Sequence, residues 1–284
     1  MASICTLISS MDNSGTPMPD FERPPVVETV LSVEFAPLQN WGIPHFGLFW
    51  SELREEFPEF QVQPPLGSQI ERSATEDLAG QDAILQVSAV PRVRCWFMHR
   101  EKNSLIQVQD NHFAFNWRKI GEGDSYPRYE KIIRPHFLSC WGRFREFVRA
   151  QAIGEIEVLQ AEVTYVNHLP IGEGWESVSD LPSVFPEWSG MTSGDFLPAP
   201  ERAYFGVNYA MPNAQGRLRV TLQPALRSVD AKEVLQLTLT ARGRPTTSDP
   251  DSVSQWLDMG REWVVRGFKD FTSRKMHALW KLTN

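Results

Sequence analysis

The sequence has few cysteines and no long apolar run. Its three cysteines, Cys5, Cys95 and Cys140, are odd in number and widely spaced, so a disulfide framework is not expected and a reducing cytoplasm is the predicted location. No window approaches the roughly 18 consecutive apolar residues of a membrane-spanning helix. The first residues hold a short apolar patch with no basic segment before it, which argues against a secretory signal. We therefore expect no membrane association.

Motifs that carry chemistry are also missing. The six histidines form neither H-E-x-x-H nor a Cys/His cluster with ligand spacing, so no metal and no cofactor are expected. There is no G-x-S-x-G elbow, and Cys95 and Cys140 each adjoin a tryptophan, which is typical of buried structural thiols. The G-E-G at 121–123 lacks the third glycine of a dinucleotide site. A non-enzymatic protein is therefore predicted, with an enzyme that assembles a cleft between its halves as an open alternative.

Charge alternates along the chain. Residues 1–91 carry a net charge of −10, residues 92–149 carry +6, residues 150–200 carry −8 and residues 201–284 carry +5. One interpretation is that these blocks neutralise one another across an internal interface. The other is that the 92–149 block forms an electropositive surface for an acidic partner or a nucleic acid.

The first part of the chain predicts a tail followed by strands and two helices. Residues 1–24 are rich in Ser, Pro, Asp and Met and show no periodicity, which predicts a mobile tail. The expected order from 25 to 157 is a strand at 26–35, a helix from Pro44 to Phe57, mostly loop over 59–80, a long strand within 83–100, a hairpin at 104–118 and a long helix at 129–149. In that helix Tyr129, Ile133, Phe137, Trp141, Phe144 and Val148 form an apolar stripe. Pro135 predicts a kink or the true helix start.

The hairpin is the clearest local pattern in the sequence. A two-residue turn at Asp110-Asn111 suits the positive φ angles of a type I′ turn. The resulting register pairs Gln109 with His112 and Val108 with Phe113. It separates an apolar face from a polar face, and the polar face carries Gln107, Gln109, His112, Asn116 and Arg118.

The second part of the chain repeats this order of elements. A strand is expected at 159–169, an irregular acidic connection at 170–202, three strands at 203–210, 217–223 and 233–241, and a long helix from about 250, with Thr272 capping a short final helix. The predicted fold class is α+β, with two similar halves at 25–157 and 158–284. Each half is expected to be an antiparallel sheet with a long helix packed across one face.

Five segments stand out together: P-P-V-V-E at 24–28, Q-V-Q-D-N-H-F-A-F-N-W-R-K at 107–119, Y-P-R-Y-E at 126–130, E-V-T-Y-V-N-H at 162–168 and F-K-D-F-T-S-R-K-M-H-A-L-W at 268–280. In this order they resemble a sporadically distributed family of uncharacterised bacterial proteins, over roughly residues 24 to 282. The resemblance implies a bacterial cytoplasmic protein of patchy occurrence, which suits genomic-island genes for defence or toxin neutralisation. It implies no activity, cofactor or catalytic residue.

The leading functional hypothesis is a non-enzymatic cytoplasmic interaction module that presents a polar, basic surface to an acidic protein partner. The predicted binding residues are Gln107, Gln109, His112, Asn116, Arg118 and Arg128. The alternative is single-stranded nucleic-acid binding through the 92–149 segment, with aromatic rings for stacking and basic residues for phosphates. Against that alternative, the face pattern assigns Trp117 and Tyr129 to the core.

Overall fold

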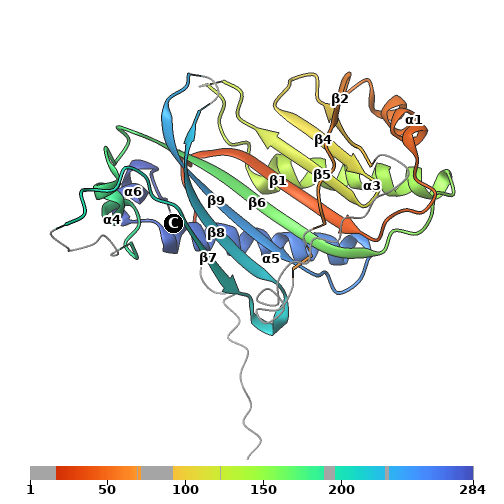
Figure 1. Cartoon of the computed structure of the whole chain (residues 1–284). Helices are drawn as coiled ribbons and strands as arrows, with labels where there is room; N and C mark the ends of the chain where they lie inside the picture. The colour runs from red at the N-terminus through yellow and green to blue at the C-terminus, as the bar shows by residue number, and fades with distance from the viewer. Residues whose placement is uncertain are drawn as a thin grey trace, which may run out of the picture.

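The protein is built on one large antiparallel sheet. The computed structural model describes residues 17–68, 70–71, 92–121, 123–188, 196–227 and 230–283. Within them the strand order is β2-β3-β4-β5-β1-β6-β9-β8-β7, and every neighbouring pair is antiparallel (Figure 1). The strands are β1 (Val26–Phe35), β2 (Glu59–Gln63), β3 (Arg94–Met98), β4 (Ser104–Gln109), β5 (His112–Arg118), β6 (Val158–Pro170), β7 (Phe205–Ala210), β8 (Arg217–Leu226) and β9 (Glu233–Gly243). The predicted α+β class is confirmed.

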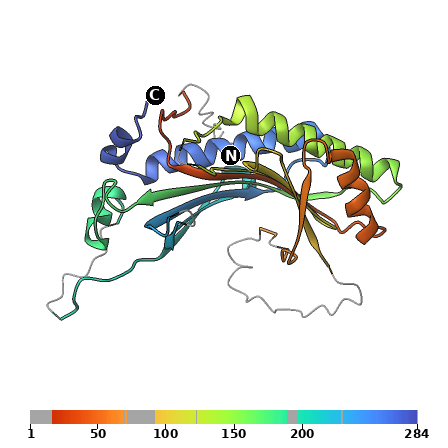
Figure 2. The same ribbon diagram turned by 90° about the horizontal axis from the view of Figure 1, so that it is seen from above.

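Two long helices cover one face of this sheet and lie side by side (Figure 2). The helical elements are α1 (Ile43–Leu53), the π-helical turn η1 (Tyr129–Ile133), α3 (Arg134–Ala150), the 3₁₀ turn η2 (Val178–Asp180), α4 (Leu181–Val184), the 3₁₀ turn η3 (Pro212–Ala214), α5 (Pro250–Phe271) and α6 (Arg274–Leu279). None of the helices in the described residues is long and apolar enough to cross a membrane.

The hairpin formed by β4 and β5 has the predicted register. Gln109 pairs with His112, Val108 with Phe113 and Gln107 with Ala114. Phe113 of β5 contacts Phe137, Trp141 and Phe144 of α3, so the apolar face of the hairpin lies toward α3. The polar row lies on the opposite face of the sheet, because side chains alternate along a strand.

Helix α3 buries the predicted stripe against the sheet. Phe137, Trp141, Phe144 and Val148 are each at most 1% exposed. The ambiguity at Pro135 is resolved by the backbone, since Pro135 occupies the first turn of α3 and the residues before it form the wider turn η1. A π-helical turn holds one more residue than an α turn, so it changes the angular position of Tyr129 relative to the α3 stripe.

Three expectations from the sequence need correction. Residues 59–63, expected to be loop, form the edge strand β2. The cap of α6 is Ser273, whose Oγ accepts from the Met276 N–H, whereas Thr272 ends α5. Residues 17–24 are not a free tail, because Phe21 is 5% exposed and packs on Phe268 and Trp280. Residues 83–91 of the long strand expected within 83–100, and residues 1–16 of the tail, lie outside the described part of the chain.

The sheet runs without a break across the predicted boundary between the halves. β1 and β6 pair over nearly their whole length at the centre, with Leu31 opposite Val163. The outer strands follow on either side, β5 then β4 beside β1, and β9 then β8 beside β6 (Figure 1). The core is therefore shared between the first and second parts of the chain, with α3 over one side and α5 over the other.

Candidate functional site

Five of the predicted binding residues lie together on the polar face of the sheet. Gln107, Gln109 and Asn116 are 7%, 1% and 4% exposed, and His112 and Arg118 are half-buried. The exposed polar row expected from the sequence is therefore wrong for these three amides. Leu66 packs over Gln109, since its N–H donates to Gln109 Oε1 over 2.8 Å and its carbonyl accepts from Gln109 Nε2 over 3.1 Å.

The amides bond to one another and to neighbouring side chains. Gln107 Nε2 donates to Asn116 Oδ1 over 2.7 Å, and Asn116 Nδ2 donates to Glu28 Oε1 over 2.7 Å. Gln107 Oε1 in turn accepts from Arg94 and Trp96. The side-chain amides of Gln107 and Asn116 are partnered within this network, so their contacts are those of a structural polar layer.

His112 belongs to this layer as a neutral imidazole. Burial lowers its pKa to about 4, and Arg94 and Arg242 lower it further, against the opposing effect of Glu162. A histidine held neutral in this way contributes no positive charge to a binding surface near neutral pH.

Basic and acidic blocks of the sequence meet in ion pairs. Arg143 Nη1 lies 2.9 Å from Glu56 Oε1, and Arg217 Nη1 lies 3.0 Å from Glu71 Oε1. Arg242 Nη2 lies 2.5 Å from Glu162 Oε2. These pairs favour the interpretation in which the alternating charges neutralise one another within the fold.

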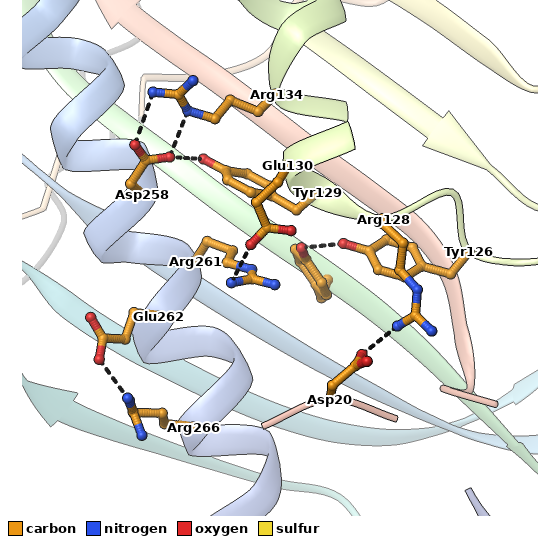
Figure 3. Close-up of polar contacts among 11 residues, drawn as sticks. Asp20, Tyr126, Arg128, Tyr129, Glu130, Arg134, Asp258, Arg261, Glu262 and Arg266 are labelled. Atoms are coloured by element: carbon orange, nitrogen blue, oxygen red, sulfur yellow. Dashed lines mark hydrogen bonds and ion pairs between the residues drawn. The ribbon is translucent and has the colours of Figure 1, made fainter. Parts of the chain in front are cut away.

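Arg128, the sixth predicted residue, lies on the helix-covered side and lines a cavity of about 290 Å³. We call this the helix–sheet cavity; it lies between η1 and α5, over β1, β6 and β9 (Figure 3). Its described lining residues are Met18, Pro19, Asp20, Phe21, Pro24, Val26, Tyr126, Arg128, Glu130, Lys131, Tyr165, Asn167, Leu239, Arg261, Val264, Val265 and Phe268. Most of this lining is apolar, with polar groups contributed by the residues around η1 and by α5. That composition is typical of small-molecule sites.

Two tyrosines and an arginine form the polar end of the cavity. The hydroxyls of Tyr126 and Tyr165 are 2.6 Å apart. Arg261 on α5 interacts with the Tyr165 hydroxyl as a hydrogen-bond donor, and its Nη1 lies 2.8 Å from Glu130 Oε1 (Figure 3). Its guanidinium also lies over the Tyr129 ring, with 5.3 Å from Cζ to the ring centroid.

The hydrogen bonds of the two tyrosines leave one proton over. A guanidinium can only donate, so the Tyr165 oxygen accepts from Arg261. Either phenol can donate in the bond between Tyr126 and Tyr165, and that bond uses one of the two phenol protons, so the other has no protein acceptor among the described residues. The Arg261 Nε is also buried without a partner there.

Titratable groups here are held in their neutral forms. Burial raises the pKa of Tyr165 and raises that of Tyr126 well above its usual value, and the neighbouring hydroxyl adds to the shift of Tyr126. Elsewhere, burial raises the pKa of Cys95 to about 11 and that of Cys140 to about 12. The cavity phenols are therefore hydrogen-bond donors at neutral pH, and the two thiols are not nucleophiles.

The backbone is strained where η1 begins. Arg128 has φ 71° and ψ 137°, a conformation that L-residues rarely adopt. Its Nη1 donates to Asp20 Oδ1 over 2.5 Å and to the Phe21 carbonyl over 3.1 Å. Strained backbone and π-helical turns both concentrate at functional sites, and here they coincide at the wall of a cavity.

Both ends of the described chain close over this cavity. Residues 17–24, which we call the N-terminal strap, bond to residues 280–283: the Glu22 N–H donates to the Lys281 carbonyl over 3.0 Å, and the Thr283 N–H donates to the Asp20 carbonyl over 2.8 Å. Phe21 is held against Phe268. The strap therefore forms one wall of the cavity, supported by α6 and the residues that follow it.

The binding residues predicted from the sequence include Arg128, which lines the cavity. They do not include Tyr126, Tyr165 or Arg261, which form its polar end. A signal was present, because four of the five segments that carry the family resemblance supply lining residues, among them Val26, Tyr126, Tyr165 and Phe268. The segments lie far apart in the chain, so only the tertiary structure brings them together.

No group of three or more His, Cys, Asp or Glu able to hold a metal occurs in the described residues.

Comparison with known proteins leaves the identity of the chain open. No known protein family matches it, and no curated protein is similar to it. Among solved structures it is similar to the crystal structure of DynU16, a protein in the dynemicin biosynthetic locus, with 9% identity and a TM-score of 0.26 over 86% of this chain and 97% of that chain. A TM-score this low carries no conclusion about fold or function.

Proposed function

We propose that this chain is a non-enzymatic binding protein that takes a small molecule into the helix–sheet cavity. The observation that carries the proposal is the phenol proton left unused by the Tyr126–Tyr165 pair at the polar end of an otherwise mainly apolar cavity of about 290 Å³. That volume lies at the lower end of the range for small-molecule sites, roughly 300–1,000 Å³. The strained Arg128 and the turn η1 support the same site.

A binding role fits the chemistry of the cavity better than catalysis. A general base needs a pKa near the working pH, whereas Tyr126 and Tyr165 have their pKa values raised by burial. Arg261 is a permanent cation with no proton to give. The cavity groups are therefore suited to hold and orient a ligand.

The test is a small-molecule screen by thermal shift on the wild type and two variants. Val265→Trp places a large ring in the cavity, and Leu48→Trp places one at a position on α1 that is 48% exposed and away from the cavity. A ligand at 100 times its Kd should stabilise the wild type and Leu48→Trp by about 2.7 kcal/mol, and should not stabilise Val265→Trp. A screen whose hits all stabilise Val265→Trp equally, or a screen with no hit, would refute the proposal.

A protein partner remains a second candidate, favoured by the outer edge of β7. β7 is an edge strand, and its sequence Phe205–Ala210 has no charged residue and no proline to protect that edge. Val207 and Tyr209 are 37% and 42% exposed on it. An extended segment of a partner could pair with this edge by strand addition. A partner with an acidic surface has less support, because Arg128, Arg143 and Arg242 form ion pairs with acidic side chains of this chain.

Co-purification tests this second candidate. A partner retained by the wild type and by Leu226→Lys, at a position 70% exposed on β8, should be lost with Val207→Lys on the edge itself. Equal retention by both variants would exclude the β7 edge.

The nucleic-acid alternative has no support from the aromatic residues of the 92–149 segment that were expected in the core, since Trp117 and Tyr129 are 5% and 2% exposed and their rings are not available for stacking on bases.

We further propose that the two parts of the chain, 25–157 and 158–284, arose by duplication. The support is the strand order. From the centre outward it reads β1, β5, β4, β3 on one side and β6, β9, β8, β7 on the other. One long helix follows each set of strands along the chain.

A cytoplasmic location and a role in defence or toxin neutralisation stay proposals that rest on the sequence.

A further inference from the structure

We infer that the ligand of the helix–sheet cavity is a small amphipathic monoanion, a carboxylate on an apolar body, with its head group at the Tyr126–Tyr165 pair and Arg261. This inference rests on the proposed function and adds the chemical class of the ligand. It follows from the donors, the charges and the apolar lining of the cavity, taken in turn.

The polar end of the cavity offers donors where a ligand needs acceptors. Tyr165 accepts from Arg261, and the bond between Tyr165 and Tyr126 uses only one of their two protons, so one phenol proton of the pair has no acceptor among the described residues. The buried Arg261 Nε is a second donor without a partner beside the cavity. Buried donors without acceptors are rare in folded proteins. Two donors match the two oxygens of a carboxylate, whereas an ammonium group would add further donors.

The charges around the cavity leave one positive charge to neutralise. Among the described lining residues Arg128, Lys131 and Arg261 are cationic, and Asp20 and Glu130 are anionic. Arg128 pairs with Asp20 and Arg261 pairs with Glu130. One net positive charge therefore remains in the lining, that of the exposed Lys131. A monoanion is attracted to this charge, a neutral alcohol is not, and a cation is repelled by it.

The rest of the lining is suited to an apolar body. Phe21 of the strap and Phe268 of α5 are in edge-to-face contact, with ring centroids 5.4 Å apart. Val264, Val265 and Leu239 complete this side of the lining together with Val26. At about 30 Å³ per molecule the cavity volume corresponds to about ten waters, so the body must be small.

The test uses three probes of equal chain length, octanoate, 1-octanol and octylamine, with binding measured by isothermal titration calorimetry. Octanoate should bind about tenfold or more tightly than octanol, because a hydrogen bond to a charged group is stronger than one to a neutral group. Octylamine should not bind in the cavity. The double variant Tyr126→Phe/Tyr165→Phe removes both hydroxyls and should weaken octanoate by about tenfold while changing octanol much less.

Two further variants separate the head-group contact from folding. Arg261→Met removes the charge and should abolish the preference for octanoate, but it also removes the Glu130 pair and the contact with the Tyr129 ring. Its control is Arg266→Met, on the same helix, whose Nε pairs with Glu262 away from the cavity (Figure 3). The control should bind octanoate like the wild type.

The outcomes distinguish this inference from the proposed function. If octanol binds as tightly as octanoate, or if Tyr126→Phe/Tyr165→Phe leaves octanoate binding unchanged, the monoanion class is wrong, even where Val265→Trp shows that ligands do enter the cavity. If octanoate fails to bind while other screened molecules bind in a Val265-dependent way, the class is also wrong and the cavity remains a binding site. If no molecule binds in a Val265-dependent way, the proposed function itself fails.

Discussion

At the residue scale, single side chains connect parts of the chain that are distant in sequence. The Tyr129 hydroxyl donates to Asp258 Oδ1 over 2.8 Å, while its ring supports the Arg261 guanidinium. Arg134 donates to both carboxylate oxygens of Asp258, at 2.8 and 3.0 Å. These contacts join η1 and α3 to α5 beside the cavity, so the two helices fix the position of its polar end.

His112 provides a prediction about pH. Its folded-state pKa of about 4 lies below the usual 6.5 because of burial, so between these values the unfolded chain binds more protons than the folded protein. The contribution of His112 to stability is full above pH 6.5 and is lost as the pH falls toward 4. From pH 7 to pH 5 this loss should be about 2 kcal/mol at most, because one pKa unit corresponds to 1.36 kcal/mol.

The measurement is urea unfolding of the wild type and His112→Gln at pH 7 and pH 5. The variant keeps a polar side chain that does not titrate, so its stability should fall less over this interval. His168 and His277, whose pKa values are also lowered by burial, supply the slope that remains in both proteins. Identical slopes for the two proteins would show that His112 is not held neutral by the fold.

At the element scale, α5 lies close to the sheet because two of its residues have no side chain. A Cβ at Gly267 would lie 2.5 Å from Cδ2 of Leu218, which is 2% exposed on β8. A Cβ at Gly260 would lie 3.0 Å from the Trp256 ring and 3.3 Å from Val163. The helix that carries Arg261 is therefore positioned by close contact at both glycines.

Gly267→Ala should destabilise the protein by about 1–2 kcal/mol, because overpacking of about 1–3 kcal/mol outweighs the gain in helix propensity. The matched control is Gly142→Ala in α3, where a Cβ would meet no atom within 4 Å. That change should stabilise by about 0.5–1 kcal/mol. Chemical denaturation of both variants checks the prediction, and a stabilising Gly267→Ala would show that α5 lies less tightly on the sheet than described.

At the scale of the whole molecule, the continuous sheet makes the two parts of the chain one folding unit. β1 belongs to the first part and β6 to the second, and they pair at the centre of the sheet. Separating the parts would expose two long central strands as edges. The helices α3 and α5 also meet through Arg134, Ser254 and Asp258.

We therefore expect a single cooperative unfolding transition. Tryptophan fluorescence and far-ultraviolet circular dichroism should give coincident curves in urea, since both parts lose structure together. Two separated transitions, or a part 158–284 that folds alone as a monomer, would show that the parts are independent domains.

Local patterns in the sequence were sufficient for the elements and insufficient for the site. The hairpin register and the α3 stripe were predicted because alternation and three-to-four spacing depend on neighbours close in sequence. The strand β2 was missed because Phe60 and Val62 are 53% and 62% exposed, so burial did not shape its pattern. The polar row was located correctly, but its burial depends on segments that cross the sheet from elsewhere in the chain.

The sequence by itself determined the α+β class, the two-faced hairpin and the two long helices, because each follows from short-range periodicity and turn chemistry. Only the tertiary structure decided that β1 and β6 pair at the centre and that Tyr126, Tyr165 and Arg261 meet at one cavity. Those contacts join residues up to 141 positions apart. Strand order and helix packing across such separations are set by the burial of the whole core, which no local pattern encodes.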